Sequence, residues 1–159
     1  MRIGIGYDVH QLSKGETLVI GGVHIPGEKG LVGHSDADVL IHALMDALLG
    51  AMGKGDIGFH FPDTDEKYKD ISSLILLENI KENILKNNYI IENIDMIVMA
   101  ENPKIAPYYQ KMKDNIVQIL DITSDRINIK ATTTEKLGFI GREEGIAAEA
   151  VVLLTKNDN

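Results

Sequence analysis

The sequence predicts one α+β domain over 1–159: a mixed four-stranded sheet with helices packed on one face and an N-terminal hairpin beside it. Three observations predict this class. The 159 residues are enough for one domain with a substantial core. Alternating apolar segments and segments of helical periodicity follow one another in the order β-β-α-α-β-α-β-β, around a β-α-β-α-β-β core. No internal repeat or low-complexity segment interrupts that order.

The first strand is predicted over 2–9, and its alternation gives it two different faces. One face is apolar and the other carries two glycines and two polar residues: Ile3, Ile5, Tyr7 and Val9 against Gly4, Gly6, Asp8 and His10. The segments 17–20 and 23–25 are predicted to pair as a hairpin around Gly21 and Gly22.

Three segments have helical periodicity. The first helix is predicted over 36–52, with Ser35 or Asp36 as its N-cap. A second follows over 72–87, and Pro107 opens a third that ends near residue 120. The residues 54–65 between the first two contain glycine, aspartate and proline, and therefore predict a loop.

The remaining strands are predicted over 90–100, 126–131 and 146–154. The last of these is almost entirely apolar, which predicts a strand that is buried on both faces.

Composition excludes several classes of protein. The chain has no cysteine, so disulfide scaffolds, thiol nucleophiles and thiolate metal sites are ruled out. Its net charge of −8 argues against a nucleic-acid partner. No apolar run approaches the roughly 20 residues that span a bilayer, and the N-terminus does not resemble a signal peptide. We expect no membrane association and a cytoplasmic location in a bacterium, or a plastid-type organelle if a transit peptide was removed.

A metal site is predicted from the first strand and the first helix. Asp8 and His10 leave the same face of the strand, and His42 supplies a third ligand from the helix. Two histidines and one carboxylate form a known catalytic zinc set with an open fourth position. Asp46 lies one turn after His42 and is predicted to accept its imidazole N–H. The alternative is an incidental Asp-x-His pair and a core histidine.

Four further segments suit phosphate or sugar recognition. Gly33–Asp36 precedes the first helix, where backbone N–H groups and His34 could meet an oxyanion; the alternative is a plain N-cap. The segment 130–136 combines three threonines with Glu135, a suitable oxygen ligand for Mg²⁺, unless it is only a polar turn. The acidic loop 56–65 could bind a sugar diol or a cation, or could simply be solvated. The two prolines of 100–107 favour a rigid backbone-lined pocket or a merely rigid loop.

Together these segments resemble one family, the 2-C-methyl-D-erythritol 2,4-cyclodiphosphate synthases of the non-mevalonate isoprenoid pathway. The resemblance covers nearly the whole chain. It rests on Asp8-Val9-His10, on the segment from His34 to Asp46, on Gly55–Gly58, on Phe61–Asp65, on Pro103-Lys104 and on the segment 130–145. The last of these, with Thr132-Thr133-Thr134-Glu135-Lys136, is the most specific.

The resemblance implies a lyase that forms a ring by expelling CMP. Its substrate would be 4-diphosphocytidyl-2-C-methyl-D-erythritol 2-phosphate and its product 2-C-methyl-D-erythritol 2,4-cyclodiphosphate. It also implies a homotrimer with active sites at the subunit interfaces. An apolar central cavity able to hold an isoprenoid diphosphate, with Arg142 at its mouth, is a further hypothesis; ordinary packing between subunits is the alternative.

By position, the resemblance assigns zinc to Asp8, His10 and His42, and Mg²⁺ or Mn²⁺ to Glu135. It makes His34 and Thr133 stabilisers of the transition state. The expected substrate contacts are Ser35, Asp56, Ile57, Gly58, Phe61, Pro62, Asp63, Thr64, Asp65, Ala100, Glu101, Asn102, Pro103, Lys104, Ile105, Ala106, Thr132, Thr134, Phe139 and Arg142.

The predicted chemistry needs no protein nucleophile, since the 2-phosphate of the substrate attacks its own β-phosphorus. We expect divalent cations and proximity to provide most of the acceleration.

Two other functions remain open at this point. One is a zinc hydrolase that uses the same ligands to activate water, and the other is a trimeric binding module with a structural metal.

Overall fold

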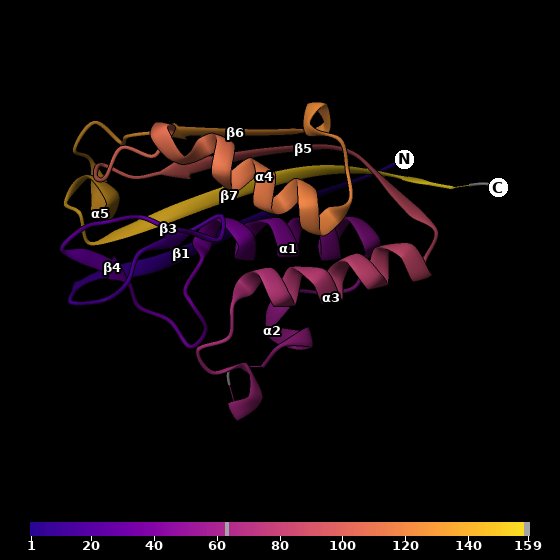
Figure 1. The fold of residues 1–159 in the computed structure, drawn as a ribbon, viewed down its shortest axis with the longest axis horizontal. Coiled ribbons are helices and arrows are strands. Elements are labelled where there is room, and N and C mark those ends of the chain that lie inside the picture. The colour runs from indigo at the N-terminus through magenta and orange to yellow at the C-terminus, as the bar shows by residue number, and fades with distance from the viewer. Residues whose placement is uncertain (63, 158–159) are drawn as a thin grey trace.

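A computed structural model describes residues 1–62 and 64–157, which form two sheets and a layer of helices (Figure 1). The larger sheet has five strands in the order β4-β1-β7-β5-β6. These are Lys29–Leu31 (β4), Arg2–Lys14 (β1), Gly145–Lys156 (β7), Tyr89–Met99 (β5) and Ile127–Thr132 (β6). A separate two-stranded sheet pairs Val19–Ile20 (β2) with Val23–His24 (β3).

The large sheet is mixed. β7 pairs antiparallel with β1 on one side and with β5 on the other, whereas β5 and β6 are parallel. The register places Val9, Ala147, Met99 and Thr132 in one row across β1, β7, β5 and β6. The C-terminal half of β1 and the C-terminal end of β6 therefore share one end of the sheet, three strand spacings apart.

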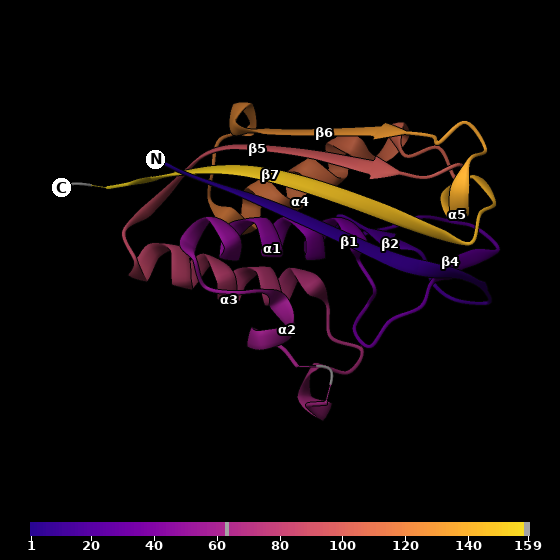
Figure 2. The same cartoon turned by 180° about the vertical axis from the view of Figure 1, so that it is seen from behind.

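Three long helices cover one face of this sheet, as the two opposite views show (Figures 1 and 2). They are Val39–Met52 (α1), Ser73–Lys86 (α3) and Tyr109–Leu120 (α4). Five short helical segments lie in the connections between the larger elements: Ile57–His60 (α2), Glu66–Tyr68 (η1), Ala106–Tyr108 (η2), Ser124–Arg126 (η3) and Gly138–Gly141 (α5). Among the described residues, no helix is both long enough and apolar enough to cross a membrane.

Helix α1 is the centre of the core, because it lies between the sheet and α3. Twelve of its fourteen residues are buried, as expected for a helix that is apolar on nearly all sides. Its contact with β1 is unusually close. A Cβ added at Gly6 would overlap the carbonyl oxygen of Ala43 and lie 2.7 Å from the Ala47 nitrogen. Gly4 is in the same position one turn further along the helix, against Ala47 and Ala51.

The other face of the sheet is open in the single chain. The apolar row predicted on β1 is exposed there: Ile3, Ile5, Tyr7 and Val9 are 73%, 65%, 51% and 44% exposed. Val151 and Leu153 of β7 are half-buried on the same face. The prediction that the last strand is buried on both faces is therefore wrong for one chain, since helices cover only one side of the sheet.

The mixed sheet with helices on one face, its four long strands, the hairpin and the three long helices are confirmed. Two features differ. The strand β4 was missed, and it makes a fifth strand because β1 continues to Lys14. Helix α1 begins at Val39, with Asp38 rather than Ser35 or Asp36 as its N-cap. The reason is that the Asp36 carboxylate is bonded to Ser73, while Asp38 accepts from the Ile41 nitrogen.

We predict that Gly6→Ala destabilises the fold by about 2–3 kcal/mol, because the added methyl group forces α1 away from β1. Thermal or urea unfolding followed by circular dichroism measures the loss. Gly50→Ala is the matched control, since the nearest atom to its Cβ is 3.8 Å away. That variant should gain about 0.5–1 kcal/mol from the higher helix propensity of alanine. Equal stability of the two variants would contradict the close-packing argument.

Candidate metal centre and surrounding cavity

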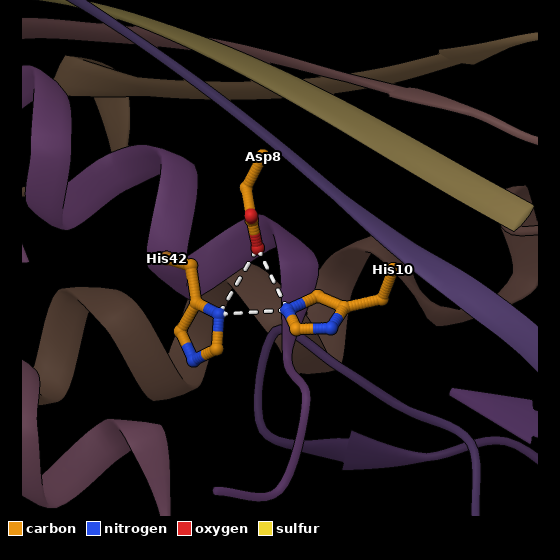
Figure 3. A group of neighbouring side chains, drawn as sticks. All are labelled: Asp8, His10 and His42. Carbon is orange, nitrogen blue, oxygen red and sulfur yellow. Dashed lines mark hydrogen bonds and ion pairs between the residues drawn. The ribbon is translucent and has the colours of Figure 1, made fainter. Parts of the chain in front are cut away.

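Three side chains from two elements converge on one point (Figure 3). Asp8 and His10 leave the same face of β1, and His42 lies at the first turn of α1. The Asp8 Oδ2 atom lies 3.0 Å from His10 Nε2 and 3.0 Å from His42 Nδ1, and the two ring nitrogens are 3.1 Å apart. The predicted ligand set is thus brought together by the fold.

The two histidines turn lone pairs toward this point, because their other nitrogens are bonded elsewhere. His10 Nδ1 lies 2.8 Å from the carbonyl oxygen of Val32, to which it can only donate. His42 Nε2 lies 2.9 Å from Ser73 Oγ and 3.2 Å from Ser35 Oγ. Two imidazole nitrogens and a carboxylate oxygen at these separations form a ligand set that can hold a cation between them.

The residues fit a tetrahedral divalent ion. Metal–ligand distances of about 2.0–2.1 Å separate the ligand atoms of such an ion by about 3.3 Å. The three observed separations, 3.0, 3.0 and 3.1 Å, are close to this value. With three protein ligands, the fourth position is left to water or substrate, as in catalytic rather than structural sites.

The electrostatics of Asp8 suit a metal ligand. Burial by itself raises the pKa of the Asp8 carboxyl, but the neighbouring imidazole groups of His10 and His42 outweigh burial and hold that pKa well below its usual range. The carboxylate is therefore ionised and available to a cation throughout the physiological range.

Two aspartates near His42 on the chain, Asp38 and Asp46, do not belong to this centre. Asp46 was predicted to accept the imidazole N–H of His42, but its Oδ1 accepts instead from the Ile57 nitrogen at 2.8 Å. That prediction is wrong, because the loop after α1 folds back onto Asp46. Asp38 is fully buried and accepts from the nitrogens of Gly21, Gly22 and Ile41. It joins the β2–β3 turn to the start of α1, and its burial raises its pKa to about 6.

A cavity of about 210 Å³ opens beside the three ligands. Of the residues predicted from the sequence, Asp8, His10, His34, Ser35, His42, Ile57, Gly58 and Phe61 line it. The Nε2 atom of His34 is buried and has no hydrogen-bond partner among the described residues. A buried imidazole nitrogen without a partner is costly, so this atom is available to a polar ligand in the cavity.

Some residues of the acidic loop 56–65 line the cavity, whereas others make only local contacts within the loop. The Asp56 side chain accepts from the Phe59 nitrogen at the start of α2, and Asp65 pairs with Lys67 at 2.9 Å. Pro62 and Thr64 do not line the cavity. Asp63, also a predicted substrate contact, lies outside the described residues. Roles of these five residues in substrate binding remain predictions.

The threonine-rich turn lies elsewhere and is held by Glu101. One oxygen of Glu101 accepts from the backbone nitrogens of Thr134 and Lys136, both at 3.0 Å. Between them Glu135 has a φ of 53°, and its carboxylate accepts from the Thr133 hydroxyl at 3.1 Å. Glu101 was predicted as a pocket residue, and its bonds here are to the turn that presents Thr133 and Glu135.

The segment 100–106 and the last predicted contacts also lie apart from the metal centre. Asn102 and Pro103 line a second cavity of about 290 Å³, with Lys29 and Glu143. Ala100 and Ile105 are buried, whereas Lys104 and Ala106 are exposed. Phe139 is 37% exposed, and Arg142 forms two hydrogen bonds of 3.0 Å with Glu144. Thr132 hydrogen-bonds the neighbouring Thr133 carbonyl.

Sequence reasoning missed four residues of the site. Met45, Tyr68 and Leu76 line the cavity, and the Ser73 hydroxyl contacts His42 Nε2. Met45 and Leu76 have the helical periodicity of ordinary core residues and Tyr68 lies in a short turn, so none of the three gives a signal of a cavity. Ser73 next to Ser72 at a helix start looks like a second candidate N-cap, and only the fold shows its contact with His42.

Comparisons with known proteins place this chain among closely similar sequences. The YgbB family profile matches residues 1–155. A 2-C-methyl-D-erythritol 2,4-cyclodiphosphate synthase from Halothermothrix orenii is 66% identical over 154 residues, which cover 97% of this chain and 93% of that protein. One from a Geobacillus species is 60% identical over 155 residues, covering 98% of both.

Solved structures agree with the sequence comparison. The IspF–CDP complex of Plasmodium falciparum superposes with a TM-score of 0.87 at 38% identity, covering 99% of this chain and 97% of that one. The bifunctional IspDF of Campylobacter jejuni gives 0.94 at 47% identity, and there this chain covers 42% of the longer protein.

We predict that His42→Ala lowers the affinity for a divalent metal by at least about 100-fold, because it removes one of three ligands. Elemental analysis after gel filtration measures the bound metal per chain. His60→Ala is the matched control, since the His60 ring contacts only the Lys54 carbonyl and neighbouring aromatic rings. Equal metal content in the two variants would remove His42 from the site.

Proposed function

The chain belongs to the YgbB family and to its 2-C-methyl-D-erythritol 2,4-cyclodiphosphate synthases, and from this premise we propose how its residues perform the reaction. The enzyme converts 4-diphosphocytidyl-2-C-methyl-D-erythritol 2-phosphate to 2-C-methyl-D-erythritol 2,4-cyclodiphosphate and CMP. This is a phosphorus–oxygen lyase step in isoprenoid precursor biosynthesis. The observation that carries the proposal is the convergence of Asp8, His10 and His42 beside a cavity that could hold the reacting phosphates.

The reaction forces two anionic groups of one molecule together. At about 4 Å and an effective dielectric constant near 20, two like unit charges repel by roughly 4 kcal/mol. Zn²⁺ held by Asp8, His10 and His42, and Mg²⁺ or Mn²⁺ held by Glu135, would offset this repulsion and polarise the β-phosphoryl oxygens. Carboxylate and neutral imidazole suit Zn²⁺, and a lone carboxylate with phosphate oxygens suits Mg²⁺.

The chain's own groups orient the substrate. His34, with its unpartnered Nε2, and Ser35 line the cavity, where they can hydrogen-bond phosphoryl oxygens as charge develops. Thr133 would do the same from the turn that Glu101 holds. Ile57, Gly58 and Phe61 give the cavity an apolar wall that suits the methylerythritol carbons. Folding the substrate so that its 2-phosphate lies in line with the β-phosphorus provides proximity, worth up to roughly 7–11 kcal/mol.

The two groups of site residues are separated within one chain. Strands β1 and β6 are three spacings apart, about 14 Å at about 4.8 Å per strand. None of the described cavities is lined both by the metal ligands and by Thr132–Glu135. A neighbouring subunit that brings its own turn to the metal cavity would complete the site.

The exposed sheet face supports a homotrimer with active sites between subunits. Its apolar row on β1 is a continuous stripe of four exposed side chains, whereas exposed apolar residues on a monomer surface are usually scattered singly. Three copies packed around a central axis would bury these rows against one another. Binding of an isoprenoid diphosphate in the resulting central cavity, with Arg142 at its mouth, stays a prediction; the Arg142 guanidinium would first have to leave Glu144.

We predict that incubation with the cytidylyl substrate, Zn²⁺ and Mg²⁺ yields the cyclic diphosphate and CMP, and that a chelator abolishes turnover. Phosphorus NMR identifies the products. Linear hydrolysis products would instead indicate a zinc hydrolase. Unchanged substrate with stoichiometric bound metal would indicate a binding module. Turnover that persists at full rate after complete metal removal would contradict the roles of Asp8, His10, His42 and Glu135.

We predict that Ile5→Asp dissociates the trimer, because three charged carboxylates would then be buried near one axis. Sedimentation velocity should show a shift from trimer to monomer, together with loss of turnover. Ile75→Asp is the matched control, since Ile75 is 51% exposed on α3, on the opposite side of the molecule. A wild-type chain that sediments as a monomer would overturn the proposed assembly.

A further inference from the structure

The proposed reaction assigns no role to Ser73, although this residue contacts a metal ligand. It is the first residue of α3, it is fully buried, and its hydroxyl contacts His42 Nε2 at 2.9 Å. The same hydroxyl makes a short hydrogen bond to Asp36 Oδ1. We propose that Ser73, backed by Asp36, is a positioning residue that holds the His42 ring with its Nδ1 lone pair toward the metal. The inference rests on the metal site of the proposed function.

The direction of the hydrogen bonds carries the argument. An ionised carboxylate only accepts, so the single hydroxyl proton of Ser73 is committed to Asp36. The Ser73 oxygen therefore faces His42 as an acceptor, and His42 Nε2 must carry the ring proton. A neutral imidazole with its proton on Nε2 has a free lone pair on Nδ1, which is the atom 3.0 Å from Asp8 Oδ2.

Asp36 is itself held in place, which makes the chain of bonds rigid. Its Oδ2 accepts from the Ser73 nitrogen at 2.9 Å, and its Oδ1 accepts from the Asp38 nitrogen at 3.2 Å. Rotation of the carboxylate would break both bonds. Ser35 also approaches His42 Nε2, at 3.2 Å, but no second bond within the described part of the chain fixes the direction of its hydroxyl. Ser73 is therefore the partner that selects the tautomer.

The same contacts tie the metal centre to the loop that ends at α3. The Asp36 nitrogen donates to the Ile71 carbonyl at 3.2 Å, and the Asp70 nitrogen donates to the His34 carbonyl at 2.9 Å. The segment 70–73 closes the loop that contributes Phe61 and Tyr68 to the cavity. Changes in this loop can therefore reach His42 through Ser73 without contacting the metal.

Three variants of the full-length chain test the inference. Ser73→Ala should weaken zinc binding about 10–100-fold, as measured by competition with a chromophoric chelator, because the ring loses its fixed tautomer. Asp36→Asn should weaken it as well, since an amide can donate to Ser73 and free the serine proton to point at His42. Ser72→Ala is the matched control: it removes the cap of the same helix, where Ser72 Oγ accepts from the Leu74 nitrogen, without contacting His42. Its zinc affinity should stay within about twofold of wild type.

A spectroscopic readout separates positioning from a general loss of structure. Long-range ¹H–¹⁵N correlation spectra of the chelated protein at pH 8 report which nitrogen of His42 carries the proton. Wild type and Ser72→Ala should show the Nε2–H form, whereas Asp36→Asn should shift His42 toward the Nδ1–H form. This second variant keeps the test valid if Ser73→Ala does not fold.

The outcomes distinguish a failure of the positioning role of Ser73 from a failure of the metal assignment. If wild type binds zinc and both Ser73→Ala and Asp36→Asn retain its affinity and tautomer, the positioning role is overturned while the metal site stands. If wild type itself binds no zinc, the metal assignment of the proposed function fails.

Discussion

The close approach of helix α1 to strand β1 is the constraint on which the rest of the structure depends. Gly4 and Gly6 leave no side chain between them and the helix, so α1 lies directly on the strand. Any side chain there would move the helix outward and take His42 with it. Asp8 and His10 follow Gly4 and Gly6 on the same face of β1. The contact between α1 and β1 therefore also places the three ligands within about 3 Å of one another. The same close approach of helix to strand thus determines both the packing of the core and the positions of the ligands.

The polar groups around the ligands follow from burial. A buried imidazole must satisfy two nitrogens, and here each histidine turns one inward and bonds the other outward. Val32 provides a backbone acceptor for His10, and Ser73 provides one for His42. Gly33 matters for the first of these, since a Cβ there would lie 3.1 Å from the His10 ring. The carboxylates of half-buried Asp36 and fully buried Asp38 are in turn satisfied by N–H groups, so they organise the loops and do not compete for the cation.

The separation of the two groups of site residues within one chain is the reason to propose an assembly. The metal ligands and the turn with Thr133 and Glu135 lie at the same end of the sheet, but two strands intervene between β1 and β6. The face that would bring another copy into place is the apolar side of β1, opposite the face that carries the ligands. One strand can therefore serve both purposes, because successive side chains alternate between its two sides.

The sequence by itself determined the elements with strong periodicity and the ligand set. The alternation of residues 3–10 placed Asp8 and His10 on one face, and the absence of cysteine left only carboxylates and imidazoles as ligands. The tertiary structure decided what depends on contacts between distant segments. Asp46 has the right helical spacing to reach His42, yet the returning loop offers it the Ile57 nitrogen instead. Ser73 lies 31 residues from His42, and no local pattern reports a hydrogen bond across that separation. Spacing predicts which side chains share a face, whereas the partner of a buried polar atom is decided only by what the fold packs against it.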